Sequence, residues 1–292
     1  DEICLFDLYL PKYKDTRIRR EIGTVENSAI LKKFSSERFG LIFYLASIVS
    51  GEAEENFEKG WNVNLFSMWN FLSALKVEHL NSSRKYIPKV IFTSSIAVFG
   101  SPFPDKIDDE FLCSPQTSYG AQKASIEILI SDFSRKGFIN GISLRLPTIC
   151  VRPGKPNKAA SGFFSNIIRE PLNGKKAYLP VDPSVRHWHA SPRSAVNFLI
   201  HAVSLETFQL ENRRSLNLPG VSCTVEEQIE SLRSIAGQKA VDLIVPKKDL
   251  SIQNMVKGWP KNFSPLKASQ LGFKSENNFN EIIKIFIEDD LN

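Results

Sequence analysis

The stretch Lys89-Val-Ile-Phe-Thr-Ser-Ser-Ile-Ala-Val-Phe-Gly100 decides the fold that the sequence predicts. It begins as an apolar run typical of a buried strand and ends in hydroxyl-bearing residues and a glycine. Similar apolar runs occur at residues 3–6, 41–45 and 142–149, with helical spacing between them at 28–34, 57–75 and 121–133. Strands that alternate with helices form a parallel sheet covered on both faces. We therefore predict a doubly wound α/β fold that binds ligands at the carboxyl ends of its strands.

A candidate catalytic group combines this strand end with the next helix. Tyr119 and Lys123 lie in Ser118-Tyr-Gly-Ala-Gln-Lys123, so they face the same side of a helix one turn apart. An ammonium group near a phenol favours the phenolate, which can act as a base. A Tyr-x-x-x-Lys pair alone is common. The serine-rich strand end that holds Ser95, 24 residues before Tyr119, makes the combination specific.

Composition argues against several functional classes. The chain has 292 residues, 42% of them hydrophobic, and a formal net charge of +5 with acids and bases interspersed. This modest charge does not favour nucleic acid as a partner. No apolar run approaches the roughly 20 residues that span a membrane. The four cysteines are far apart, without a Cys-x-x-Cys pair, which argues against structural zinc or disulfides and favours a reducing cytoplasm.

The pattern of predicted elements changes after Pro153. Prolines and glycines then punctuate short elements, and helical spacing returns at 191–203, 225–235 and 279–287. We expect residues 1–152 to form one domain and residues 153–292 to form mainly a smaller lobe, with some segments returning to the first domain. His187 and His189 lie two apart in this lobe. Because no acidic or cysteine partner is near them in sequence, we expect no metal site.

The motifs together resemble the extended short-chain dehydrogenase/reductases, the NAD-dependent epimerase/dehydratase family. The resemblance covers nearly the whole chain. Its most specific strings are Ser47-Ile-Val-Ser-Gly-Glu-Ala53, Thr93–Gly100, and Leu144-Arg-Leu-Pro-Thr-Ile-Cys-Val-Arg-Pro-Gly-Lys-Pro-Asn157. It implies a Rossmann-type domain with a smaller C-terminal substrate lobe. The longer strings are similar to the branch that oxidises a small sugar acid, D-erythronate, at C2 to its 2-keto acid, 2-dehydro-D-erythronate.

The resemblance also implies roles for individual residues. Tyr119 would be the base, Lys123 would lower its pKa and hold the nicotinamide ribose, and Ser95 would bond the reacting oxygen, with Ser94 or Thr93 as substitutes. The residues expected to contact NAD are Asp7, Leu45, Ala46, Ser47, Tyr119, Lys123 and Pro147. The residues expected to contact substrate are Ser95, Ser50, Arg152, Arg186 and Arg193, and the sequence does not rank the three arginines.

Some positions are expected to support the site or depart from the family pattern. Asn64 is expected to brace the loop after residue 45 rather than touch cofactor. Gly23-Thr24 stands where the family has Gly-Asp beside the adenine, which puts that contact in doubt. Phe99 replaces a usual tyrosine, and its ring can still pack. A carboxylate at Asp7 would repel a 2′-phosphate and favour NAD over NADP.

A dinucleotide-binding fold normally opens with a strand and a glycine-rich turn that seats the pyrophosphate. The sequence begins at what reads as the second strand of such a fold. We expect that about 30–40 residues, the usual length of a strand-turn-helix unit, precede Asp1 in the functional protein. A truncated, inactive relative is the alternative.

Two other functions remain open from the sequence. A nucleotide-sugar 4-epimerase or dehydratase would use the same three catalytic residues and retain its NAD. A non-catalytic NAD-binding scaffold would keep only the fold. In relatives the helices that correspond to 57–75 and 118–135 form a four-helix dimer interface, so we expect a homodimer.

Overall fold

The computed structural model describes residues 2–154, 159–211 and 213–291. Its main sheet is parallel throughout and has the order β3-β4-β5-β9. The four strands are β3 (Leu41–Tyr44), β4 (Lys89–Ser95), β5 (Asn140–Leu146) and β9 (Ser215–Asn217). The predicted parallel α/β arrangement is therefore confirmed.

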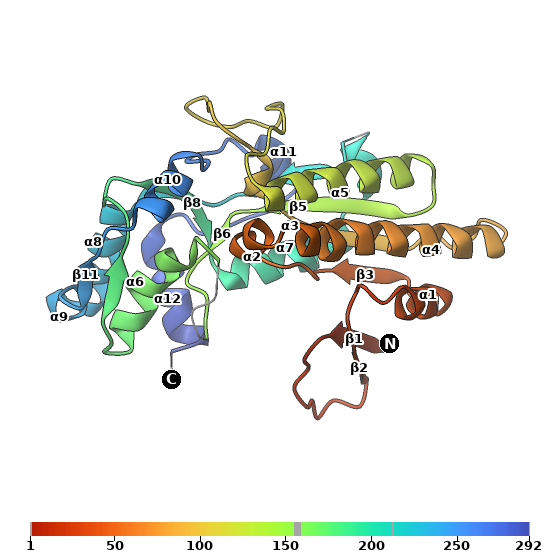
Figure 1. Cartoon of the computed structure of the whole chain (residues 1–292), viewed down its shortest axis with the longest axis horizontal. Coiled ribbons are helices and arrows are strands. Elements are labelled where there is room, and N and C mark those ends of the chain that lie inside the picture. Colours follow the sequence, from red (N-terminus) through yellow and green to blue (C-terminus); the bar gives the residue numbers. More distant parts are fainter. Residues whose placement is uncertain (1, 155–158, 212, 292) are drawn as a thin grey trace.

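Helices cover both faces of this sheet because its central strands are apolar on both sides. On one face, Val90 and Phe92 of β4 pack in a core shared with α1 (Ser28–Ser36), α4 (Ser67–Asn81) and α5 (Ser118–Arg135). On the other face, Ile91 packs in a core with α7 (Pro192–Ser204). In Figure 1 the long helices α4 and α5 run roughly along the direction of β5.

Two further strands lie beside the main sheet. They are β1 (Ile3–Asp7) and β2 (Ile18–Ile22), which pair in parallel with each other. Within the described residues they hydrogen bond to no strand of the main sheet. In Figure 1 this pair lies below β3, next to the N-terminus. The expected cofactor residue Asp7 ends β1, and the loop after β3 contains three more, Leu45, Ala46 and Ser47.

The predicted long strand at 142–149 is wrong in one respect. It divides at Pro147 into β5 and the short β6 (Thr148–Ile149), which joins a different sheet. Proline has no backbone N–H to donate to a ladder, so the pairing changes there. Beyond this point β6 pairs with β8 (Arg186–Ala190), which in turn pairs with β10 (Val221–Thr224).

The second half of the chain forms a lobe with its own apolar core. That core contains Phe164, Val225 and Ile283 among other buried side chains. Its remaining elements, visible on the left of Figure 1, are α6 (Gly162–Leu172), β7 (Ala177–Leu179), α8 (Val225–Ala236), α9 (Gln238–Val241), β11 (Ile244–Pro246), α10 (Leu250–Lys257) and α12 (Phe279–Asp289). The helices predicted at 225–235 and 279–287 are thus confirmed.

The predicted helix at 57–75 is longer and less regular than expected. It begins as α3 (Phe57–Gly60), continues as a π-helix (Trp61–Phe66) and ends with α4 at Asn81. A short α2 (Ser50–Glu55) precedes it, and α11 (Leu266–Gln270) lies near the end of the chain. Among the described residues no helix has both the length and the apolarity to cross a membrane.

Candidate active site

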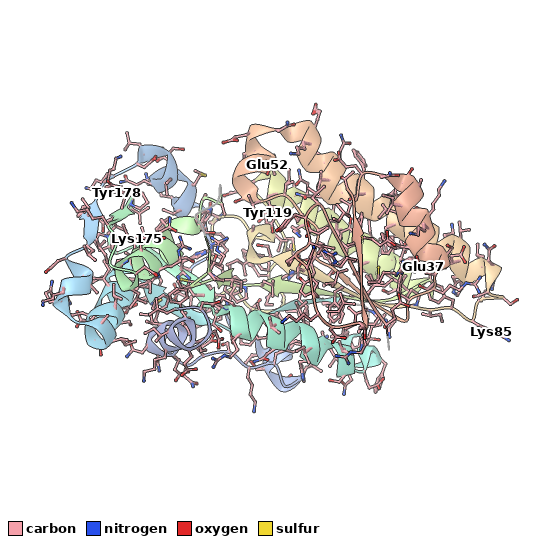
Figure 2. All side chains as sticks on the ribbon, turned by 90° about the horizontal axis from the view of Figure 1, so that it is seen from below. Glu37, Glu52, Lys85, Tyr119, Lys175 and Tyr178 are labelled. Carbon is pink, nitrogen blue, oxygen red and sulfur yellow. The ribbon has the colours of Figure 1, made fainter. Side chains whose placement is uncertain are left out.

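The structure brings Ser95, Tyr119 and Lys123 together at the carboxyl end of β4. Ser95 is the last residue of β4, and Tyr119 and Lys123 lie in the first two turns of α5. The side chain of Thr117 caps this helix by accepting a hydrogen bond from the Gly120 amide at 3.0 Å. Figure 2 shows Tyr119 between the lobe and the larger part of the molecule, far from Lys175 and Tyr178 at the outer end of the lobe.

The Lys123 ammonium group is buried beside the tyrosine. Its Nζ donates a hydrogen bond to the Thr93 carbonyl at 2.8 Å and lies 5.4 Å from the centroid of the Tyr119 ring. Burial lowers the pKa of Lys123 to about 7, and the nearby Glu127 carboxylate opposes that shift. A lysine with this pKa can gain or lose its proton near neutral pH.

The tyrosine hydroxyl lies among polar groups but within an enclosed site. Burial raises the pKa of Tyr119 to about 12, while Ser95, the Arg152 guanidinium and Ser47 oppose the rise. The phenolate that we expected near neutral pH is therefore not favoured in the protein alone. Desolvation outweighs the polar groups that favour the charged form.

Asn64 braces the loop after β3, as predicted. Its Oδ1 accepts hydrogen bonds from the Ile48 amide at 2.8 Å and from Ser47 Oγ at 3.0 Å. Its Nδ2 donates to Gln122 Oε1 at 2.7 Å. Because Gln122 precedes Lys123 in α5, this amide pair ties the loop to the catalytic helix. Asn64 itself lies in the π-helix, an irregularity that is frequent at functional sites.

Several of the expected cofactor residues lie at or just after the carboxyl ends of strands. Asp7 ends β1 with an exposed side chain, and its backbone carbonyl accepts a hydrogen bond from the Gly23 amide at 3.0 Å. Leu45, which follows β3, is 51% exposed, and Pro147 lies between β5 and β6.

The three candidate arginines have different surroundings. Arg193 forms ion pairs with Asp289 and Glu288 at 2.6 and 2.9 Å, and Arg186 pairs with Glu227 at 3.1 Å. Both already have carboxylate partners.

Arg152 has none among the described residues. Among the described residues, the one hydrogen bond from its guanidinium goes to Ser161 Oγ, at 3.4 Å, and its positive charge acts on the Tyr119 phenol. Burial lowers the pKa of Arg152, but a guanidinium remains charged in proteins. The last residues of its motif, 155–157, lie outside the described residues.

The two lobe histidines are core residues. His187 bonds the Pro260 carbonyl at 2.8 Å and Thr148 at 2.7 Å, and His189 contacts Gln228 at 2.9 Å. Both rings pack against Phe164, and burial lowers the pKa of His187 to about 4. No group of three or more potential ligand residues is placed to hold a metal ion in the part of the chain that the structure describes.

Known proteins resemble this chain over most of its length. Residues 10–191 match the NAD dependent epimerase/dehydratase family. Two curated relatives carry the name D-erythronate dehydrogenase. The Cupriavidus necator protein is 42% identical over 98% of this chain and 87% of its own length, and the Haemophilus influenzae protein is 41% identical over 100% and 91%.

The chain belongs to the NAD dependent epimerase/dehydratase family.

Solved structures agree with the family assignment. The crystal structure titled nucleoside-diphosphate-sugar epimerase from Agrobacterium tumefaciens has a TM-score of 0.94, 49% identity, and coverage of 99% of this chain and 84% of its own. L-threonine dehydrogenase from Clostridium difficile, 21% identical, has a TM-score of 0.84 over 98% and 88% of the two chains and shares the fold. The fold is the Rossmann-type α/β fold of the epimerase/dehydratase family.

Sequence reasoning missed one polar cluster behind the catalytic helix. Glu127, which is 4% exposed, accepts hydrogen bonds from Arg145 and from Ser94. Glu127 lies four residues after Lys123, so helical spacing places it on the same face. That spacing was the available signal. Phe99, expected to pack, is buried against Phe111 and Phe263.

Proposed function

We propose that this member of the epimerase/dehydratase family is an NAD-dependent dehydrogenase that oxidises D-erythronate to 2-dehydro-D-erythronate. The observation that carries the proposal is the Arg152 guanidinium, which has no carboxylate partner among the described residues and acts on Tyr119 of the Ser95, Tyr119 and Lys123 group. The two curated relatives named D-erythronate dehydrogenase support the same substrate class. A positive charge next to the base suits a substrate that carries its own carboxylate.

Each side chain then has a defined role. Tyr119 removes the proton from the C2 hydroxyl, and Ser95 hydrogen bonds to the same oxygen. Lys123 stabilises the phenolate through its positive charge and holds the nicotinamide ribose. NAD, when bound, accepts the hydride from C2, so the alcohol loses a hydride and a proton and becomes a ketone. Ser50 is the first residue of α2, after the cofactor loop, and would help to bind the acid.

The preferred cofactor follows from the loop positions. Asp7 ends a parallel strand and leaves its carboxylate exposed, at the position where the family bonds the adenosine ribose. The negative charge would repel a 2′-phosphate. We therefore infer NAD rather than NADP, with Leu45, Ala46, Ser47 and Pro147 as further contacts.

We also propose a division of labour between the two halves of the chain. Residues 1–152 would bind the cofactor and residues 153–292 would mainly bind substrate. Two elements of the second half return to the first: β9 pairs with β5, and α7 covers a face of the main sheet.

A second reading, a nucleotide-sugar 4-epimerase or dehydratase, has one supporting observation. The Agrobacterium tumefaciens structure carries an epimerase title at 49% identity. Against this, the curated UDP-glucose 4-epimerase from Corynebacterium glutamicum is only 22% identical. The third reading, a non-catalytic scaffold, does not explain why the three catalytic side chains and Arg152 converge.

A substrate panel tests the proposal. The protein is expressed from its own gene with any residues that precede Asp1. We expect it to reduce NAD with D-erythronate, and to reduce NAD more efficiently than it reduces NADP. Erythritol, the matching polyol, and UDP-glucose should give almost no NADH. Equal efficiency with both cofactors would contradict the role of Asp7. Conversion of UDP-glucose to its 4-epimer would make the second reading the function.

We propose a homodimer formed through α4 and α5. Three large apolar side chains are exposed there: Phe66 (52%) at the end of the π-helix that leads into α4, Trp69 (48%) on α4 and Ile128 (71%) on α5. They border a shallow apolar hollow between the helices, together with Leu65 and Leu129. A second copy of the same face would cover them. Light scattering should give twice the chain mass, and Ile128→Glu should give the monomer mass; a monomeric wild-type protein would contradict the proposal.

A further inference from the structure

A buried row of groups with alternating charge runs from the catalytic tyrosine into the core. Tyr119, Lys123 and Glu127 follow one another at four-residue intervals on α5, where Lys123 and Glu127 are buried and Tyr119 is partly buried. Arg145 on β5 faces Glu127 and completes the row. If Tyr119 is the phenolate, the order is negative, positive, negative, positive.

Glu127 is held firmly in this row. Its carboxylate accepts three hydrogen bonds from Arg145, at 2.7, 3.0 and 3.2 Å, and one from Ser94 Oγ at 2.5 Å. Arg145 in turn donates to Asn217 at 3.1 Å and lies 4.9 Å from the Phe99 ring centroid. A carboxylate with so many donors is fixed in place, and removing it would leave the largely buried Arg145 guanidinium without its partner.

The surroundings of Lys123 leave few groups that can sustain its charge. From β4 it receives the Thr93 carbonyl and the Phe92 ring, 4.6 Å from Nζ, neither of which is charged. From α5 it faces Tyr119 and Glu127.

The other charged groups lie beyond these neighbours. Arg145, on β5, lies behind Glu127, and the Cys113 sulfur is 3.1 Å from its Nη2. Arg152, which follows β6, acts on Tyr119. Among the described residues, Glu127 is therefore the carboxylate that acts on Lys123.

We propose that Glu127 is a positioning residue that keeps Lys123 protonated, so that the ammonium can support the Tyr119 phenolate. The proposal rests on the roles given above to Tyr119 and Lys123. Arg145 fixes Glu127, and the Ser94 contact joins the same carboxylate to the strand end that holds Ser95. Glu127 touches neither substrate nor cofactor and acts through Lys123.

The direct test measures the protonation of Lys123 without substrate or NAD. Isotope-labelled lysine allows the side chain to be titrated by NMR, and Lys123→Arg identifies its signal. In Glu127→Gln we expect the Lys123 midpoint to fall by about one pH unit or more, because a nearby opposite charge shifts a pKa by roughly 1–3 units. Glu127→Asp keeps the charge and should restore most of the wild-type midpoint.

Kinetics provide the second readout. Near neutral pH, kcat/KM of Glu127→Gln should fall about ten-fold, in step with the smaller fraction of protonated Lys123. Asp132→Asn is the matched control, because it removes an exposed carboxylate from the same helix. It should change neither the midpoint nor the rate.

The possible outcomes distinguish a failure of the proposed role of Glu127 from a failure of the proposed function. A Lys123 midpoint that is the same in wild type and Glu127→Gln would overturn the proposal, whatever the rates are. A wild-type protein without dehydrogenase activity would contradict the proposed function and leave the titration as a valid test of Glu127. If Glu127→Gln does not fold, the double variant Glu127→Gln, Arg145→Gln removes both charges and should lower the midpoint in the same direction.

Discussion

Tyr119→Phe is expected to lower kcat for D-erythronate oxidation by about 10²–10⁴-fold, the usual contribution of a general base. The substitution removes only the hydroxyl that takes the substrate proton, and the phenyl ring still fills the buried site. NAD affinity should therefore change by no more than a few-fold. Steady-state kinetics give kcat, and quenching of tryptophan fluorescence by NAD gives the affinity.

A second tyrosine provides the control for this experiment. Tyr86 donates a hydrogen bond from its hydroxyl to the Phe39 carbonyl at 2.9 Å, and Figure 2 shows its neighbour Lys85 at the end of the molecule opposite the lobe. Tyr86→Phe also removes one hydroxyl from a structural hydrogen bond, and it should leave kcat unchanged. If Tyr119→Phe kept more than about half of the wild-type rate, Tyr119 would not be the base.

The features that could be predicted from the sequence are those set by local patterns. Apolar runs gave the strands β1, β3 and β4, and helical spacing gave α5 and α12, because burial on one or both faces imposes these periods. The catalytic group was predictable for the same reason. Ser95 ends a strand, and Tyr119 and Lys123 lie one turn apart at the start of the next helix, so the fold itself brings them together.

Other features depend on contacts between distant parts of the chain. Arg193 is neutralised by Asp289 and Arg186 by Glu227, and these partners lie 96 and 41 residues away. No local sequence pattern predicts ion pairs between residues so far apart in the chain, so the sequence could not rank the candidate arginines. The division of the predicted strand at Pro147 was in principle visible, since proline cannot donate to a ladder, but which sheet each half joins is a tertiary choice.

The pKa of Tyr119 was misjudged for a related reason. A lysine one helical turn away suggests a phenolate, but the sequence does not say how completely the site is buried. In the folded protein, burial dominates both groups and moves their pKa values apart, to about 12 for Tyr119 and about 7 for Lys123. The charges of Tyr119 and Lys123 therefore depend on burial and on the polar and charged groups next to them.

The contrast among the three arginines leads to the second large effect. Arg152→Gln should lower kcat/KM for D-erythronate by between about ten-fold and a hundred-fold, because a hydrogen bond to a charged group contributes roughly 1.5–3 kcal/mol. A guanidinium matches two carboxylate oxygens. In the part of the chain that the structure describes, the Arg152 guanidinium makes one hydrogen bond, to Ser161 Oγ at 3.4 Å. Glutamine keeps polarity and approximate length but loses the charge and the fork. The loss should appear mainly in KM if the carboxylate is bound equally in ground and transition states.

Arg193→Gln and Arg186→Gln are the matched controls, since each removes one guanidinium that already has a carboxylate partner. Their kcat/KM values should stay within about two-fold of wild type, as for most surface substitutions. The neutral polyol erythritol gives a further control. It has no carboxylate to lose, so its small rate should be the same in wild type and Arg152→Gln. Suppose that Arg152→Gln keeps the preference for acid over polyol and that Arg186→Gln or Arg193→Gln abolishes it. That result would assign carboxylate binding to Arg186 or Arg193 instead of Arg152. The same loss on acid and polyol would instead mean that Arg152 maintains the site and does not recognise the substrate charge.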